Sequence, residues 1–213
     1  IAIARGETVG LVGESGSGKT SLGRTLLRLY EPSEGQLFFD GQDITHASAA
    51  TLKPLRRRMQ MIFQDPQSSL NPRHSIGTIL AGALALHGLD ASERAIIAIL
   101  DRVGLPSSAL KRYPHQLSGG QRQRVGIARA IALKPDFVVA DEIVSGLDVS
   151  TQAQVLDLLQ GLRAEMGMAL AFISHDLSVV RHLCERVVIM KGGEIVEEGR
   201  TAEVFAAPRT AFT

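Results

Sequence analysis

The sequence predicts an α/β fold with a largely parallel sheet, a small antiparallel β region and an inserted, mostly α-helical subdomain. Short apolar runs alternate with helical patterns over most of the 213 residues, which is typical of strands joined by crossover helices. A helical block from Ile76 to Leu133 interrupts this alternation. The turn signals Asp40-Gly41 and Gly192-Gly193 indicate two hairpins.

The first third of the chain predicts three strands and one helix. Proline cannot continue a helix, so the helical pattern from Lys19 is expected to end at Tyr30, before Glu31-Pro32. Prolines, serines and an asparagine make residues 65–73 turn-like. The strands are expected at Thr8–Val12, at Gln36–Asp40 with a hairpin to Ile44, and at Met59–Phe63.

The remainder continues the alternation after the helical block. Within that block, Ile96, Ile99, Leu100 and Val103 follow the i, i+3, i+4, i+7 spacing of one helix face. Further on, we expect strands at Phe137–Ala140 and Ala169–Ile173, a helix over Val155–Met166, and a hairpin of Arg186–Lys191 with Glu194–Glu198.

Composition excludes several classes of protein. With 23 basic and 22 acidic residues the net charge is +1, which gives no support to a nucleic-acid-binding surface. The one cysteine, Cys184, excludes an internal disulfide framework and a thiolate zinc site, and is expected to pack on an apolar face. The most apolar window, Ile76–Leu89, is too short to cross a bilayer. We expect no secretion signal, since no charged segment followed by an apolar run is visible at the start of this sequence.

A phosphate-binding loop is the clearest motif. Residues 13–20, GESGSGKT, match G-x-x-x-x-G-K-[ST] between a predicted strand and a predicted helix. Glycines let backbone N–H groups turn towards a phosphate, and the helix N-terminus adds its positive dipole. Lys19 would reach the β- and γ-phosphates, and the Thr20 hydroxyl would bind Mg²⁺. We expect a nucleotide site here.

Two acidic residues, Asp141 and Glu142, directly follow the predicted strand that ends at Ala140. Ligands of open parallel sheets lie beyond the carboxyl ends of the strands, so Asp141 can meet Mg²⁺ above the phosphate loop. Glu142 could polarise an attacking water as a general base. By themselves, Asp141 and Glu142 could equally be an ordinary strand end followed by a capping acid. In a chain that also has the phosphate-binding loop, they indicate a site of nucleotide hydrolysis.

A second anion-binding nest is predicted at Leu117–Gln121, the string LSGGQ, where Ser118 and two glycines open a helix. Together with the phosphate loop before it and residues 137–142 after it, this string resembles the nucleotide-binding domain of ATP-binding cassette (ABC) transporters. The resemblance covers essentially the whole chain. It implies a P-loop NTPase (RecA-like) core at about residues 1–73 and 134–213, and a helical signature subdomain at about 74–133, within one ABC ATPase domain trimmed at both ends.

The resemblance also implies a head-to-tail dimer with two composite ATP sites. From the residues alone, Gln64 is a surface-loop glutamine and His175 a strand-end cap, but in the family these positions are the Q-loop glutamine and the switch histidine. Asp148 matches the D-loop acid. The implied catalytic residues are Glu142, His175, Gln64 and Lys19; the Mg²⁺ ligands are Thr20, Gln64 and Asp141; and ATP is bound by Gly13, Glu14, Ser15, Gly16, Ser17, Gly18, Lys19, Thr20, Ser21, Asp148 and the partner-facing Ser118, Gly119, Gly120 and Gln121.

Three features depart from the family pattern. Ile143 stands where proline usually follows the catalytic glutamate, and Gly146 stands where alanine is usual, so the loop carrying Asp148 is expected to be looser. No aromatic residue lies in Ile1–Val12 to stack on adenine. We therefore expect this chain to bind ATP weakly and with little preference over GTP.

The stretch Ile62–Pro72 resembles the Q-loop of ATPases that serve oligopeptide, dipeptide and nickel importers. Residues 112–118, 148–154 and 173–180 resemble the same subfamily. This implies a peripheral protein at the cytoplasmic face of the inner membrane, with a second ABC ATPase subunit and membrane-spanning permease subunits as partners. A solute-binding protein is implied indirectly, and no nucleic acid is expected. The alternatives are a soluble ABC-type ATPase of DNA repair or translation, and a P-loop kinase or GTPase, which leaves Leu117–Gln121 unexplained.

Overall fold

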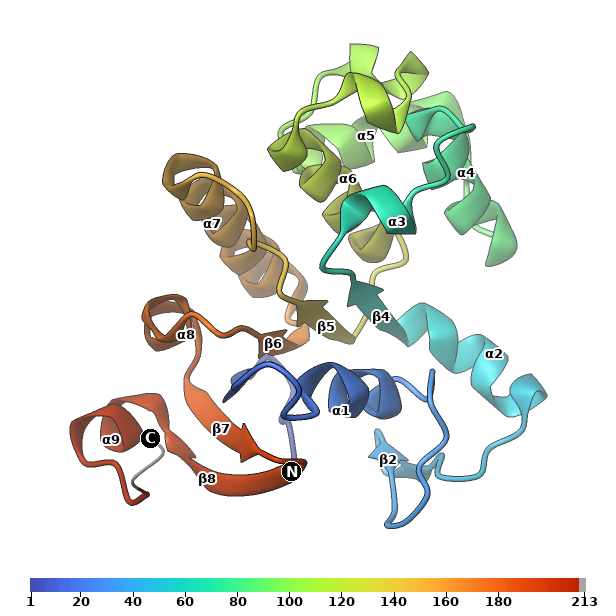
Figure 1. The fold of residues 1–213 in the computed structure, drawn as a ribbon. Helices are drawn as coiled ribbons and strands as arrows, with labels where there is room; N and C mark the ends of the chain where they lie inside the picture. The colour runs from blue at the N-terminus through green and yellow to red at the C-terminus, as the bar shows by residue number, and fades with distance from the viewer. Residues whose placement is uncertain (211–213) are drawn as a thin grey trace. The chain divides into compact units, whose positions relative to one another are not determined.

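The computed structural model describes residues 1–210 and divides the chain into two compact units (Figure 1). Unit 1 comprises Ile1–Met61, Asp136–Glu142 and the chain from Gly167 onwards; unit 2 comprises Ile62–Pro135 and Ile143–Met166. The predicted helical subdomain, 74–133, lies wholly inside unit 2. Its assignment as part of one ABC ATPase domain stays a prediction.

Unit 1 is built on a six-stranded sheet in the order β4-β5-β6-β1-β7-β8. The first strand in the chain is central and pairs in parallel with β6 and β7, whereas β7 and β8 form an antiparallel hairpin. The predicted mixed α/β fold with a largely parallel sheet is confirmed. The strands are β1 (Thr8–Gly13), β4 (Met59–Ile62), β5 (Phe137–Asp141), β6 (Ala169–Ile173), β7 (Arg186–Lys191) and β8 (Glu194–Arg200).

The strand register brings the site-bearing strand ends to one edge of the sheet. Ile173 in β6 is level with Leu11 in β1 on one side and with Asp141 in β5 on the other. Gly13 is level with Met190 in β7. Residues that follow β1, β5 and β6 therefore emerge side by side, as expected for the ligand-binding edge of a parallel sheet.

The helix α1 (Lys19–Leu26) packs closely on the sheet through Gly23. A Cβ atom at Gly23 would lie 2.8 Å from Ile173 Cδ1 and 3.0 Å from Val139 Cγ1, so the helix backbone almost touches β6 and β5. On another part of the sheet, a Cβ at Gly10 would lie 3.1 Å from Cys184 Sγ. The buried Cys184 follows helix α8 (Leu177–Leu183) and fills space against β1, in agreement with a packing role.

The prediction that the first helix runs to Tyr30 is wrong, because α1 ends at Leu26. Arg28 adopts a left-handed backbone conformation with φ 51°, and the N–H of Leu29 bonds back to the carbonyl of Arg24 at 2.8 Å. Tertiary contacts of the Arg28 side chain fix this early end. They depend on residues distant in sequence, which a local helical pattern cannot reveal.

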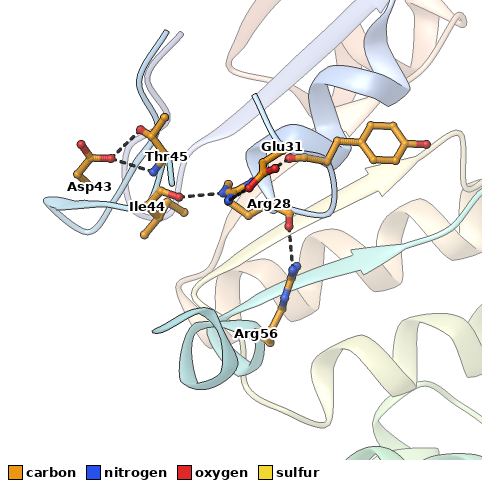
Figure 2. Close-up of polar contacts among 7 residues, drawn as sticks. Arg28, Glu31, Asp43, Ile44, Thr45 and Arg56 are labelled. Carbon is orange, nitrogen blue, oxygen red and sulfur yellow. Dashed lines mark hydrogen bonds and ion pairs between the residues drawn. The ribbon is translucent and has the colours of Figure 1, made fainter. Parts of the chain in front are cut away.

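Two arginines anchor the C-terminal end of α1 (Figure 2). The side chain of Arg28, 4% exposed, donates from Nε to the carbonyl of Ile44 at 2.8 Å. Arg56, in helix α2 (Ala49–Arg58), donates to the carbonyls of Leu27 and Arg28 at 2.7 and 2.8 Å. Because the last carbonyls of a helix lack intrahelical partners and carry partial negative charge, cationic donors stabilise this end.

The predicted hairpin at Asp40-Gly41 is confirmed, with shorter strands than expected: β2 (Phe38–Phe39) and β3 (Gln42–Asp43) are antiparallel. At its turn, Asp40 accepts hydrogen bonds from Arg5 at 2.8 Å and Arg58 at 2.7 Å. These two guanidinium groups lower the pKa of Asp40 to about 2. Arg58 also contacts Asp136 at 2.5 Å, which links the hairpin to the segment that leads into β5.

Unit 2 is helical, and its core is formed by side chains such as Ile76, Leu80, Leu100 and Ile127. Of the predicted helix face, Ile96, Leu100 and Val103 are buried. Residues 65–73, expected to form a turn, contain a one-turn helix. Asp65 starts this helix, because its carboxylate accepts a hydrogen bond from the Ser68 N–H and its backbone carbonyl accepts one from the Ser68 hydroxyl. The helices are α3 (Pro66–Ser69), α4 (Ile76–Leu86), α5 (Glu93–Arg102), η1 (Ser107–Lys111), η2 (Pro114–Gln116), α6 (Gly119–Ile131) and α7 (Val149–Met166), the last starting earlier than predicted.

Two further features complete the fold. Unit 1 ends with helix α9 (Thr201–Ala206), which packs against β8. Within residues 1–210, no helix combines the length and the apolar composition needed to cross a bilayer.

Candidate nucleotide-binding site

The predicted phosphate loop joins β1 to α1 and is held tightly in place. Gly18 is the N-cap of α1 with φ 96°, a conformation that glycine adopts without strain. A Cβ at Gly13 would lie 2.2 Å from the carbonyl oxygen of Met190, so no larger residue fits beside β7. The N–H of Gly193, in the β7–β8 turn, donates to the carbonyl of Ser17 at 3.1 Å. The turn therefore braces the loop.

The side chain of Lys19 turns back into the phosphate loop, and the residue is only 5% exposed. Its Nζ donates to the carbonyls of Gly13 and Glu14, both at 2.8 Å, and to the Ser17 hydroxyl at 3.3 Å. These acceptors are neutral, so the loop surrounds a buried positive charge without neutralising it. Since a buried charge is costly until an opposite charge meets it, the loop is suited to a phosphate group.

Thr20 and Asp141 meet beside the loop, where the Thr20 hydroxyl donates to Asp141 Oδ1 at 3.0 Å. Burial raises the pKa of Asp141, which is 3% exposed, while the Thr20 hydrogen bond opposes that rise. Both oxygens are hard donors of the kind Mg²⁺ binds, and Mg²⁺ sites typically combine one or two protein ligands with phosphate oxygens. The Thr20 and Asp141 oxygens therefore fit Mg²⁺ bound together with a nucleotide.

Glu142 and His175 form a pair at the same sheet edge. The distance from Glu142 Oε1 to His175 Nδ1 is 3.4 Å, and the two side chains are 19% and 62% exposed. The backbone of Glu142 is left-handed, with φ 44°, and its N–H donates to the carbonyl of Ile173 at 3.0 Å. A non-glycine residue in this conformation is strained, and such strain is often found at functional sites.

The signature string forms the N-terminus of α6 in unit 2. Ser118 is the N-cap: its hydroxyl accepts from the N–H of Gln121 at 3.3 Å, and the Gln121 side chain accepts from the N–H of Ser118 at 3.1 Å. A Cβ at Gly120 would lie 2.4 Å from Thr151 Cγ2, so α6 and α7 approach closely here. Asp148 accepts two hydrogen bonds from Thr151, at 2.9 and 2.7 Å, which lower its pKa.

The predicted site residues thus fall into two sets. In unit 1, residues 13–21 lie with Asp141, Glu142 and His175. Unit 2 carries Gln64, which is exposed, together with residues 118–121 and Asp148. One contributor was missed from the sequence: the Gly192-Gly193 turn indicated a hairpin, but only the strand order reveals that it contacts the phosphate loop.

The profile of the ABC transporter family matches residues 1–145. The chain belongs to the ABC transporter family. A peptide import ATP-binding protein of Brucella ovis is 53% identical to this cassette over 99% of the chain, which covers 68% of that relative. The glutathione import ATP-binding protein GsiA of Salmonella paratyphi A is 51% identical over 98% of the chain and is much longer, so the cassette covers 34% of it.

Solved cassettes share the fold. The dimeric structure of a post-hydrolysis state of an ATP-binding cassette, bound to ADP and Pi, is 29% identical with a TM-score of 0.84, and the match covers 94% of this cassette and 88% of that chain. The predictions of an ABC fold and of an ABC-type ATPase are therefore confirmed. The soluble alternative in DNA repair or translation is not favoured by these relatives.

Proposed function

We propose that this cassette binds Mg-ATP with residues 13–21, hydrolyses it with Glu142, and drives an importer of peptides or a related small solute. The observation that carries the proposal is the buried Lys19 ammonium group, whose hydrogen-bond acceptors in the loop are all neutral, together with the adjacent Thr20–Asp141 pair. The import roles of the relatives from Brucella and Salmonella support the transport assignment.

Each residue of the phosphate site has a distinct task. The loop N–H groups and Lys19 would bind the β- and γ-phosphates, with charge-assisted bonds from the ammonium group. Thr20 and Asp141 would hold Mg²⁺, with Gln64 as the third proposed ligand. When bound, Mg²⁺ neutralises phosphate charge. The burial that raises the pKa of Asp141 is offset once a cation faces the carboxylate.

Glu142 is the proposed general base. Its carboxylate is half-buried at the end of β5 and can accept a proton from a water that attacks the γ-phosphate. His175, 3.4 Å from that carboxylate, is exposed enough to turn towards the γ-phosphate while remaining tied to the base. The hydrogen bond from Glu142 to Ile173 fixes the strained backbone that aims the side chain.

The second anion nest is proposed to complete the site of another subunit. Residues 118–121 open a 13-residue helix whose N-terminal N–H groups favour an anion, yet a second triphosphate site has no use within one subunit. A head-to-tail dimer would place this nest and Asp148 against the partner's phosphate loop, and the solved cassette bound to ADP and Pi is dimeric. The proposed partners are a second cassette, membrane-spanning permease subunits and, indirectly, a solute-binding protein, with the cassette peripheral at the cytoplasmic membrane face.

Substitution of the base tests the hydrolytic assignment. We expect Glu142→Gln to retain Mg-ATP binding and to lower hydrolysis by at least about 10²-fold, within the usual contribution of a general base. Lys19→Ala should instead weaken nucleotide binding. The control is Glu34→Gln, an exposed carboxylate outside the site, which should change neither property. Near-wild-type hydrolysis by purified Glu142→Gln would refute the role of Glu142.

Mixed dimers test the composite site. Subunits with Lys19→Ala, mixed with subunits with Ser118→Arg, would place both lesions in one site and leave the other site intact. Partial recovery of hydrolysis over either variant alone is expected. If mixed dimers form and no activity returns, the head-to-tail arrangement is wrong.

A further inference from the structure

The turn between β7 and β8 has a hydrogen-bond donor that the hairpin itself does not use. Lys191 is level with Glu194, so Gly192 and Gly193 form a two-residue turn. Their φ values of 57° and 90° are both positive, as in a type I′ turn. The closing hydrogen bond of such a turn joins the residues on either side of the pair. The N–H of Gly193 is therefore left over, and it donates to the carbonyl of Ser17 at 3.1 Å.

Three residues of the phosphate loop lie against this end of the hairpin. Gly13 is level with Met190 in the sheet. A Cβ atom at Gly18 would lie 3.7 Å from both the Cα of Gly193 and the Cε of Met190. The carbonyl of Ser17 is bonded to the turn directly. Because the loop and the turn touch on both sides of this hydrogen bond, a displacement of the turn changes the position of the loop.

The bond from Gly193 also fixes the direction of the next N–H group in the loop. A trans peptide group is planar, and its C=O and N–H point in opposite directions. The C=O of Ser17 points to the turn, so the N–H of Gly18, in the same peptide group, points away from it. Within residues 1–210 this N–H has no hydrogen-bond acceptor. Gly18 is the N-cap of α1, and the N–H groups that open a helix favour an anion.

We infer that Gly193 is a positioning residue for phosphate binding: its N–H holds the Ser17 carbonyl and thereby aims the Gly18 N–H at the phosphate that the loop receives. This role rests on the proposed function, which assigns the loop to the phosphates of Mg-ATP. Gly193 touches no phosphate itself and acts through one peptide group. Since that group meets phosphate and not the base, the effect should be the same for ATP and for inorganic tripolyphosphate.

An ester in place of the amide before Gly193 removes this one N–H and leaves every side chain unchanged. The single cysteine, Cys184, allows a recombinant N-terminal segment to be ligated to a synthetic segment without altering the sequence. The control carries its ester before Ala202, which is exposed and whose N–H has no hydrogen-bond acceptor within residues 1–210. The wild-type chain, ligated in the same way, is the reference.

The measurements are urea unfolding, the dissociation constants of Mg-ATP and Mg-tripolyphosphate, and steady-state KM and kcat. The ester at Gly193 should raise both dissociation constants and KM about tenfold or more, the range for one lost hydrogen bond to a charged group. We expect kcat to stay within about threefold, because the contact is made in the ground state and the transition state alike. The ester at Ala202 should leave binding and turnover unchanged. A merely structural role of Gly193 would lower the free energy of unfolding without changing either affinity.

Two genetically encoded variants repeat the test, and they decide it if the chain with the ester at Gly193 does not fold. A Cβ at Gly193 meets nothing within 4 Å, so only the backbone conformation limits the side chain there. Asparagine adopts a positive φ more readily than most residues, whereas a β-branched residue seldom does. Gly193→Asn should therefore keep the affinity for tripolyphosphate within about threefold. Gly193→Val displaces the turn and should weaken that affinity about tenfold.

The outcomes separate the positioning role from the proposed function. Unchanged dissociation constants in a folded chain with the ester at Gly193, or equal affinities of Gly193→Asn and Gly193→Val, would overturn the positioning role. A loss of affinity for Mg-ATP alone, with tripolyphosphate bound as before, would overturn it as well. Absence of Mg-ATP binding by the wild type, or full activity of Glu142→Gln, would instead refute the proposed function.

Discussion

The close approach of α1 to the sheet makes Gly23→Ala a quantitative test of the packing beneath the phosphate loop. The backbone at Gly23 has no positive φ, so alanine meets no conformational barrier. Its methyl group would, however, lie 2.8 Å from Ile173 Cδ1, which is shorter than real Cβ contacts allow, and 3.0 Å from Val139 Cγ1, which is tighter than most of them. Either α1 moves away from β6 or these side chains leave their rotamers.

Two effects of opposite sign set the magnitude. Alanine in place of glycine within a helix is worth about 1 kcal/mol, whereas overpacking a core costs about 1–3 kcal/mol. We expect Gly23→Ala to lower the free energy of unfolding by up to about 2 kcal/mol. Ile173→Val removes the Cδ1 atom; alone it should cost about 0.5–1.5 kcal/mol, but combined with Gly23→Ala it should recover stability.

Urea unfolding of the wild type, both single variants and the double variant gives the coupling energy. We expect a favourable coupling of about 1 kcal/mol, within the range for residues in contact. Gly161→Ala, on α7, is the matched control: a Cβ there meets nothing within 4 Å, so the change should stabilise by about 1 kcal/mol. Additive single effects, or a Gly23→Ala variant as stable as Gly161→Ala, would refute the packing argument.

Three further predictions concern charge and capping. Asp141→Asn should raise the melting temperature at pH 7, because burial raises the Asp141 pKa and ionisation of the carboxyl group above about pH 4 therefore costs stability. The hydrogen bond from Thr20 can persist in this variant. The gain in melting temperature should shrink as the pH falls below about 4, and a lower melting temperature at pH 7 would contradict the argument. Ser118→Ala should cost about 1 kcal/mol in urea unfolding, whereas Ser118→Asp, also a good N-cap to Gln121, should keep stability yet lose hydrolysis because it repels phosphate. Asp40→Asn should be less stable than wild type at neutral pH by an amount that shrinks as pH falls from about 4 through 2, because a lowered pKa gives stability only while the carboxylate is charged. A difference as large at pH 2 as at pH 7 in melting curves would exclude this cause.

Local patterns predicted most of the strands, because each buried strand is a short apolar run with turn residues on both sides. They also located the phosphate loop, since its function requires a fixed spacing of glycines and Lys19. The end of α1 was missed because the buried Arg28 reaches the carbonyl of Ile44, a contact made across the fold. In the same way, the short helix at Pro66–Ser69 depends on capping by Asp65, which a turn-like composition conceals.

The candidate site was predictable in its residue types but not in its geometry. Spacing indicated that Asp141 and Glu142 follow a strand, yet the left-handed backbone of Glu142 has no sequence signal, since glutamate seldom adopts it. The 3.4 Å contact of Glu142 with His175 depends on β5 and β6 being neighbours. Sheet order is set by packing among distant segments, so residues around each strand cannot specify it.

The central position of β1 also governs how the cassette is made on a ribosome. Its first partner, β6, is synthesised about 160 residues after it and β7 later still, so at roughly 5–20 residues per second the strand waits on the order of 8–30 s for a neighbour. During this time its apolar side chains are available for wrong pairings, a hazard of long-range contacts. The phosphate loop gains its brace from Gly193 later still. A nascent chain that has not yet emerged as far as residue 193 therefore lacks this hydrogen bond to its phosphate loop.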